Sequence, residues 1–153
     1  PERSAACAGG IEALGLTAAL SDLGDFITSG FKVPCRVEFS NVDAPLTGET
    51  ATHIFRVAQE LANNAAKHSR CTWLEIAFET TPTEARLVVS HDGMPYRPGE
   101  SDGNGSGMGM HLVRQRLDAL GASLVFHPPT SAEDGATVSV ECLVPLSPPQ
   151  NET

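Results

Sequence analysis

The feature that most constrains this sequence is a long helical pattern at residues 49–68 whose two sides differ in character. At 100° per residue, its apolar residues fall on one arc and its polar residues on the opposite arc. The apolar arc holds Ile54, Ala58, Leu61 and Ala65, and the polar arc holds Arg56, Glu60, Asn64 and Lys67. Such a helix is stable only when its apolar side is covered, so other segments must pack against it.

The polar arc of this helix suggests more than a surface. Solvation alone would explain many such arcs. Asn63 and Asn64, however, stand mid-helix, where asparagine is a poor helix former. The arc also offers a carboxylate from Glu60, a carboxamide oxygen from Asn64 and an ammonium group from Lys67 to a common point. A magnesium nucleotide could use all three groups.

The segments around this helix predict a sheet and two further helices. Helical spacing recurs at residues 11–29, where the apolar residues are Leu16, Leu20, Leu23, Phe26 and Ile27, and again at residues 108–120. Alternating or β-rich stretches predict strands at residues 33–39, 74–78, 86–90, 124–126 and 138–144. Thr47 is placed to cap the central helix. This order predicts a two-layer α/β sandwich, a mixed sheet with helices on one face.

The composition narrows the class of protein. At 153 residues the chain is about one domain long, and 41% hydrophobic with 19% charged residues is typical of a globular protein. The net charge of -9 argues against nucleic-acid binding, which needs clustered Lys and Arg. No apolar run approaches the roughly 20 residues that span a bilayer, so we expect this domain to make no membrane contact.

The cysteines and the start of the chain bear on where the protein works. Cys7, Cys35, Cys71 and Cys142 lie far apart and form no metal-ligand spacing, so we expect reduced thiols and a cytoplasmic domain. The sequence begins at Pro1 with no initiator Met and no signal segment. We therefore expect a fragment from the interior of a longer protein, which could itself be membrane anchored.

A glycine-rich stretch, SDGNGSGMGM at residues 101–110, comes directly before the last predicted helix. Backbone amides and the positive end of a helix dipole at such a point favour an anion, and phosphate is the obvious candidate. A plain surface loop remains the alternative. The stretch has no Walker lysine, and it does not follow directly from a strand as a dinucleotide fingerprint would.

A third signal, HDGMP at residues 91–95, follows a predicted strand. Taken alone, Asp-Gly after a strand indicates a turn. The three signals occur in a fixed order, however: a helix with Glu and Asn at i, i+4, then a strand ending in Asp-Gly, then a glycine loop that opens a helix. This ordered combination resembles a known family.

FRVAQELANNAAKHS resembles the asparagine box of bacterial sensor histidine kinases of the nitrate-sensor type. HDGMP resembles their first glycine box, and GMGMHLVRQRLDALGASL resembles their second. GIEALGLTAALSDL is similar to the segment that leads into this domain. The resemblance runs from about residue 10 to residue 145, nearly the whole chain.

The resemblance implies a Bergerat fold of the GHKL ATPase superfamily, with ATP held between the helices and the sheet. It implies that Asn64 coordinates Mg²⁺, that Glu60 polarises or deprotonates the attacking group, and that Lys67 and His68 lie near the phosphates. Residues 91–93, which are His91, Asp92 and Gly93, would meet the nucleotide as the first glycine box. Gly105, Gly107 and Gly109 would form the lid and its hinge, with Met108 beneath it.

The same resemblance implies how the domain takes part in two-component signalling. Residues 31–146 would be the ATP-binding catalytic domain, residues 1–30 a lead-in from a dimerisation domain, and residues 147–153 a frayed tail. The γ-phosphate would pass to a histidine on that separate dimerisation domain and then to a response regulator. The chain alone is therefore not expected to autophosphorylate.

Three positions depart from the family's pattern. His91 stands where the family has its adenine-binding Asp, Pro95 replaces the second glycine of that box, and Val138 stands where the family has a threonine. Strand parity predicts that His91 faces the helices, where a neutral imidazole would accept a hydrogen bond from the adenine amine. A kink that swings Asp92 inward is the competing geometry.

Two other functions remain open. A degenerate GHKL module that serves as a regulatory docking surface would explain His91 and Pro95. An anti-sigma-factor serine kinase of the same superfamily is the other alternative, although the lead-in segment GIEALGLTAAL argues against it.

Overall fold

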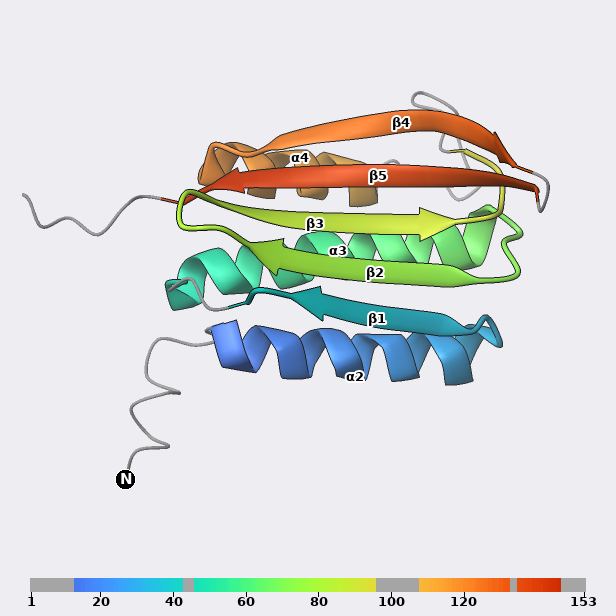
Figure 1. Cartoon of the computed structure of the whole chain (residues 1–153), viewed down its shortest axis with the longest axis horizontal. Helices are drawn as coiled ribbons and strands as arrows, with labels where there is room; N and C mark the ends of the chain where they lie inside the picture. Colours follow the sequence, from blue (N-terminus) through green and yellow to red (C-terminus); the bar gives the residue numbers. More distant parts are fainter. Residues whose placement is uncertain (1–12, 43–45, 96–107, 133–134, 147–153) are drawn as a thin grey trace, which may run out of the picture.

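The computed structural model describes residues 13–42, 46–95, 108–132 and 135–146. The helices are α2 (Ala13–Phe31), α3 (Gly48–His68) and α4 (Met108–Leu120). The strands are β1 (Cys35–Ser40), β2 (Leu74–Thr80), β3 (Glu84–His91), β4 (Ser123–Ala132) and β5 (Gly135–Pro145). In this part of the chain the strands form one sheet in the order β1-β2-β3-β5-β4, and the three helices cover a single face of it (Figure 1). The predicted two-layer sandwich is confirmed.

The sheet is mixed because only its first pair is parallel. β1 pairs with β2 in parallel, whereas β2 with β3, β3 with β5 and β4 with β5 are antiparallel. A parallel pair needs a long crossover connection, and α3 provides it between β1 and β2. The crossover places the central helix directly against the sheet.

The central helix α3 follows the sequence pattern closely. Its N-cap is Thr47, whose Oγ1 accepts a hydrogen bond from the Thr50 amide at 3.1 Å, as predicted. All four residues of the predicted apolar arc are buried. Full burial of a side chain such as Ile54 stabilises the fold by about 1.5–3 kcal/mol, so this arc fixes the helix on the sheet.

The face of the sheet that meets the helices is an apolar ladder. Alternate residues of β2, β3 and β5 point into the core, as the period of two requires. These are Leu74, Ile76, Phe78 and Thr80, then Ala85, Leu87, Val89 and His91, then Val138, Val140, Cys142 and Val144. Register places the ladder in rows, and the last row joins Leu74, His91 and Val138.

The first helix, α2, belongs to the same core. Leu16, Leu20 and Ile27 have no exposed surface and join the hydrophobic cluster that α3 builds. The boundary expected near residue 30, between the lead-in and the catalytic domain, therefore lies at the end of α2, a helix whose apolar residues belong to the same core as α3. Phe26, predicted on the apolar side, is 58% exposed, because it lies at the edge of the apolar side of α2. Its ring packs edge-on against Phe31, with 6.2 Å between the ring centroids.

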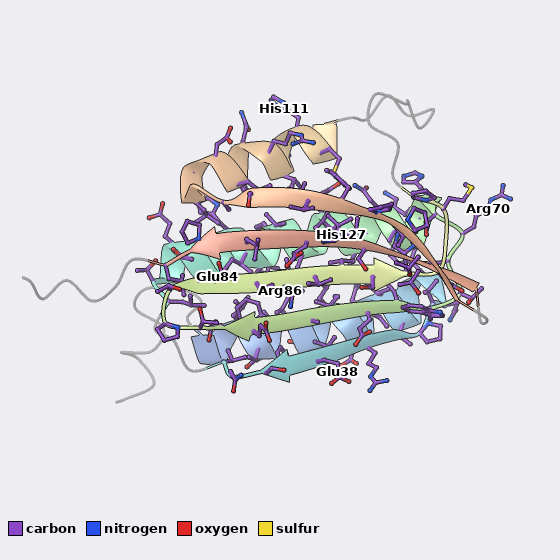
Figure 2. All side chains as sticks on the ribbon, turned by 45° about the horizontal axis from the view of Figure 1, so that its top comes forward. Glu38, Arg70, Glu84, Arg86, His111 and His127 are labelled. Atoms are coloured by element: carbon purple, nitrogen blue, oxygen red, sulfur yellow. The ribbon has the colours of Figure 1, made fainter. Side chains whose placement is uncertain are left out.

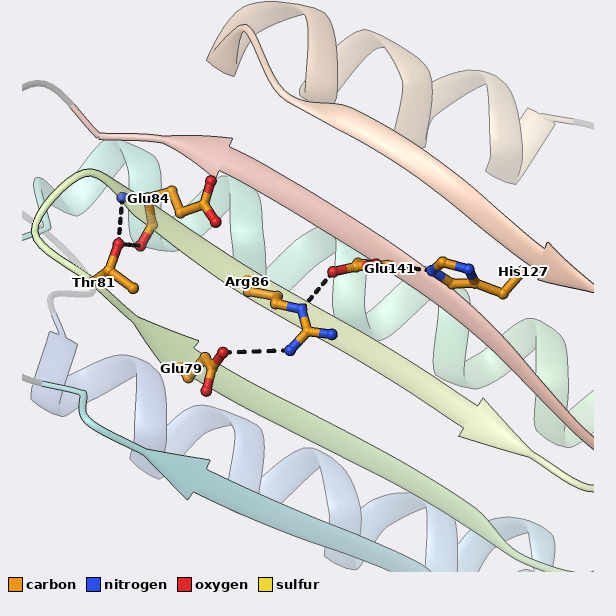
Figure 3. Close-up of polar contacts among 6 residues, drawn as sticks. All are labelled: Glu79, Thr81, Glu84, Arg86, His127 and Glu141. Atoms are coloured by element: carbon orange, nitrogen blue, oxygen red, sulfur yellow. Dashed lines mark hydrogen bonds and ion pairs between the residues drawn. The ribbon is translucent and has the colours of Figure 1, made fainter. Parts of the chain in front are cut away.

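The opposite face of the sheet is charged. Figure 2 shows Glu38, Arg86 and His127 along this side of the molecule. Arg86 contacts Glu141 through Nε and Glu79 through Nη1, the latter at 3.3 Å (Figure 3). Nε2 of His127 lies 2.8 Å from the second oxygen of Glu141.

Among the helices that the structure describes, none is long and apolar enough to cross a bilayer.

Candidate functional site

One end of the sandwich brings together the end of α3, the end of β3 and the start of α4 (Figure 1). The amide of Met94, just after β3, donates to the carbonyl of Ser69, the C-cap of α3, at 2.8 Å. Arg116 near the far end of α4 lies 3.2 Å from Nδ1 of His53 near the start of α3, so the two helices run antiparallel. The start of α4 therefore faces the end of α3.

The polar arc of α3 leads into this end. Glu60 and Asn64 are half-buried and one turn apart, while Lys67 and His68 in the last turn are exposed. Side chains at i and i+4 lie above one another on the same side of a helix. The carboxylate and the carboxamide therefore reach one region, with the Lys67 cation beyond them.

This donor set fits a magnesium ion bound through a nucleotide. No group of three or more His, Cys, Asp or Glu side chains gathers as a metal site in the described residues. Magnesium is usually held by one or two protein oxygens together with phosphate oxygens and water. Asn64, with Glu60 next to it, offers that kind of incomplete shell.

Asn63 differs from its neighbour Asn64. Its Oδ1 atom is buried and has no hydrogen-bond partner. It projects from α3 about 100° away from Asn64, outside the shared arc of Glu60 and Asn64. A buried acceptor without a partner is destabilising, so Asn63 is a useful reference for the role of Asn64.

His91 lies on the inner face of the sheet at the end of β3. The strand pairs regularly on both sides as far as this residue, which is buried together with Leu87 and Val89. The prediction from strand parity is confirmed. The Gly93 amide donates to Nδ1 of the ring at 3.0 Å. Burial lowers the pKa of His91, against a smaller opposing effect of the Asp92 charge, so the ring is neutral near pH 7.

Asp92 points to the other side and is fully engaged. Its Oδ1 accepts from the Thr72 amide at 2.6 Å and from the Trp73 amide at 3.2 Å, and its Oδ2 accepts from the Thr72 hydroxyl at 2.5 Å. Burial opposes ionisation, but these bonds outweigh it and lower the pKa of Asp92. The competing inward kink of Asp92 is therefore wrong for this structure. The carboxylate ties the end of β3 to the start of β2.

Gly93 is required by a close approach. A Cβ atom here would lie 2.4 Å from both the carbonyl oxygen and Oγ of Ser69, and 2.8 Å from the Cys71 amide nitrogen. Sequence reasoning read Asp-Gly as a turn signal but missed Ser69 and Thr72 as its partners. Arg70, at φ 61, bends the chain out of α3 and lets these contacts form.

Only the last residues of the glycine-rich stretch belong to the described part of the chain. Gly105 and Gly107 lie outside the described residues, and so does the whole of residues 96–107. The backbone of Met108 and Gly109 forms the start of α4, as predicted for the helix at residues 108–120. Met110 and Val113 anchor this helix in the core.

Two of the three cysteines in the described residues are poor candidates for a nucleophile. Cys35, Cys71 and Cys142 are free thiols. Burial raises the pKa of Cys35 to about 11 and that of Cys142 to about 12, so both are protonated at neutral pH. A surface hollow near Cys35, between α2, β1 and the start of β2, contains none of the predicted site residues.

Relatives of known kind match most of the chain. The sensor histidine kinase MctS of Rhizobium johnstonii is 29% identical over 131 residues, covering 84% of this chain and 28% of MctS. The sensor histidine kinase LiaS of Bacillus subtilis is 23% identical over 140 residues, covering 90% of this chain and 36% of LiaS. The chain thus spans roughly a third of the length of these relatives.

Solved structures share the fold. The blue-light activated histidine kinase EL346 of Erythrobacter litoralis aligns over 90% of this chain and 46% of its own, with a TM-score of 0.66 and 23% identity. The mycobacterial sensor histidine kinase MprB aligns over 87% of this chain and 95% of its own, with a TM-score of 0.64 and 19% identity. Full-length ShkA, solved in complex with AMPPNP, aligns over 87% of this chain and 29% of its own, with a TM-score of 0.65 and 13% identity.

The family itself is shown by sequence. The profile of the histidine kinase-, DNA gyrase B- and HSP90-like ATPases matches residues 49–148, which run from the start of α3 to just beyond β5. The chain therefore belongs to the histidine kinase-, DNA gyrase B- and HSP90-like ATPase family, as a histidine kinase ATPase domain.

Proposed function

We propose that this domain binds Mg·ATP where α3, β3 and α4 meet, and presents the γ-phosphate to a histidine on a separate dimerisation domain. A response regulator would receive the phosphoryl group next. The observation that carries the proposal is the half-buried pair of Glu60 and Asn64, one turn apart, at the same end of the sandwich as His91. The fold shared with ShkA, which is solved with AMPPNP, supports a nucleotide at such a site.

Each residue of the site has a proposed task. The carboxamide oxygen of Asn64 would hold magnesium, which supplies neutralisation of phosphate charge when bound. Glu60 would polarise or take the proton of the attacking group, and Lys67 and His68 would bind phosphate oxygens. His91 and Gly93 would lie next to the purine base of the nucleotide. Gly105, Gly107, Met108 and Gly109 would form the lid and its hinge.

Phosphoryl transfer asks mainly for positioning and charge neutralisation, and few side chains of this kind suffice. We propose a structural task for Asp92 in place of the nucleotide contact first expected. Both of its oxygens already accept hydrogen bonds from Thr72 and Trp73.

We also propose that the parent protein is a kinase of the nitrate-sensor type, with this domain in the cytoplasm. The motifs at residues 55–69, 91–95 and 107–124 support that subfamily. A docking module that has lost nucleotide binding is the second candidate, and the presence of His91 in place of an acidic residue favours it. Calorimetric titration with Mg·ATP separates the two, because a docking module gives no saturable heat.

The test of the proposal compares two neighbouring asparagines. Asn64→Ala should abolish thermal stabilisation by Mg·ATP, while Asn63→Ala should retain it. The two variants make the same chemical change one residue apart in α3, so effects on helix propensity cancel. Stabilisation of the Asn64→Ala protein equal to that of the wild type would contradict the metal role.

A second comparison isolates the role of Glu60 in the longer kinase. Glu60→Gln should retain nucleotide binding and slow phosphorylation of the histidine by about 10²–10⁴-fold. Glu49→Gln makes the same change in the first turn of α3, where the side chain is 84% exposed, and should leave the rate unchanged. Equal rates in both variants would remove Glu60 from the catalytic step.

A further inference from the structure

The two ring nitrogens of His91 are in different situations. The Gly93 amide donates to Nδ1 at 3.0 Å, so Nδ1 carries no proton. Turning the ring over would set a carbon-bound hydrogen against the amide hydrogen, so this bond fixes the orientation. Because burial keeps the ring neutral, its single proton is on Nε2. The remaining polar atom of His91 is therefore a hydrogen-bond donor.

The two neighbours of His91 in the sheet have apolar side chains. In the sheet His91 stands between Leu74 on β2 and Val138 on β5. Asp92, the nearest carboxylate in sequence, has both oxygens directed to Thr72 and Trp73. Within the described part of the chain, the Gly93 amide is the one hydrogen-bond partner of the ring. This row of the sheet thus offers a base one N–H group between two apolar side chains.

Resting on the proposed function, in which His91 meets the base, we propose that His91 reads the purine through its Nε2–H group and favours a triphosphate with a carbonyl at position 6 over ATP. The amine at position 6 of adenine presents hydrogens, and two donors cannot bond to each other. The carbonyl oxygen of hypoxanthine or guanine accepts from Nε2–H. Adenine satisfies the donor only by turning to offer a ring nitrogen, so ATP binds more weakly.

The hydrogen bond between His91 and the base would thus run in the opposite direction to the one that the sequence predicts. The sequence predicts that a neutral imidazole accepts from the adenine amine, but the nitrogen that could accept is occupied by the Gly93 amide. His91 is therefore a specificity-determining residue that acts in the opposite sense to a carboxylate. An aspartate at this position would accept from adenine and repel a carbonyl oxygen.

The test measures magnesium-dependent affinity of the chain for ATP, ITP and GTP by calorimetry. ITP replaces the amine at position 6 by a carbonyl without adding the second amino group of GTP. The wild type should bind ITP about tenfold more tightly than ATP. His91→Asp should reverse this order. Asp92→Asn, a change next to it on the opposite face, should keep the wild-type order.

The outcomes separate this inference from the proposed function. Equal affinities in the wild type, or a preference for ATP that His91→Asp leaves unchanged, would overturn the inference and leave the site intact. No saturable heat with any nucleotide would overturn both. If His91→Asp does not fold, His91→Asn replaces it: its amide can donate or accept, so the ITP to ATP ratio should fall to near one.

Discussion

The two faces of the sheet are built from the same strands but are stabilised by different interactions. On the inner face Phe78, Leu87 and Val89 are at most 2% exposed, and one imidazole is buried in line with them. On the outer face the side chains of Arg86 and Glu79 are 44% and 37% exposed and paired with each other. Burial therefore sets the energy of the inner face, whereas solvent screens the interactions of the outer face.

The comparison also shows where function can arise. A polar group on the inner face keeps a defined direction because its one partner is fixed and water is excluded. His91 is such a group, at the end of the ladder where α3 and α4 meet. A polar group on the outer face, such as Arg86, exchanges partners with water at little cost. Specific recognition is therefore expected at the inner end of the sheet.

The largest expected effect tests burial directly in adjacent residues of β2. Phe78→Ala should lower the free energy of unfolding by about 3–5 kcal/mol, because the ring is 2% exposed and its loss leaves a cavity. Glu79→Ala, one residue away on the outer face, should change it by less than about 1 kcal/mol. Urea denaturation measures both. Similar losses in the two variants would break the contrast between the faces.

The next largest effect concerns the junction of β3 with α3. Gly93→Ala should destabilise the fold by about 2–3 kcal/mol, because the added methyl group meets Ser69 backbone and side-chain oxygens at 2.4 Å. Gly30→Ala is the control, since no atom beyond its chain neighbours and the nearby backbone of α2 lies within 4 Å of the position of its Cβ. That variant should be neutral or stabilising by up to about 0.5 kcal/mol. A neutral Gly93→Ala would show that the junction can open.

Much of this could be predicted from the sequence where one strong period dominates. The limits of α3 to within one residue and its buried arc follow from helical spacing, and its cap follows from the capping preference of Thr47. The inward direction of His91 follows from strand parity, because β3 stays regular to its last residue. The same reasoning placed Phe26 on the apolar side of α2, but it lies at the edge of that side, where spacing cannot decide exposure.

The contacts that finish the site could not be predicted. Asp92 meets Thr72 across 20 residues, and that contact depends on the register of the β2–β3 pair. The occupation of Nδ1 of His91 depends on the path of the chain after β3, which brings the Gly93 amide to the ring. Sequence spacing identifies residue types and sides, whereas these bonds depend on positions within a few tenths of an ångström.

A smaller effect comes from the protonation of His91. The unfolded ring takes up a proton near pH 6.5, and the folded ring does so only at lower pH, because burial lowers its pKa. Between those values the unfolded state binds more protons, so stability is constant above about pH 6.5 and falls as the pH drops below it. Protonation would also place a hydrogen on Nδ1 against the Gly93 amide.

Urea denaturation at about pH 7.5 and about pH 5 measures this loss of stability. Both pH values lie above the range in which Asp92 titrates, so its carboxylate stays ionised in both. His91→Asn should remove the difference between the two conditions. His111→Asn, on the exposed side of α4 (Figure 2), should leave it as in the wild type. A wild type equally stable at both pH values would show that the ring is accessible to protons in the fold.

The smallest effect is expected on the outer face, from the ion pairs of Arg86 (Figure 3). Arg86→Met keeps the packing of the stem and should lower the free energy of unfolding by about 0.5–1 kcal/mol, and by less in 1 M salt, because exposed ion pairs are screened.

Double-mutant cycles measure separately the coupling of Arg86 to each of its two carboxylate partners. The coupling to Glu141 should exceed that to Glu79, because the Glu141 side chain is 14% exposed and the Glu79 side chain 37%. His127 stays on Glu141 when Arg86 is removed, which limits even this larger coupling. A loss comparable to that of Phe78→Ala, unchanged by salt, would mean that the outer face is not screened by solvent and that the two faces do not differ as described.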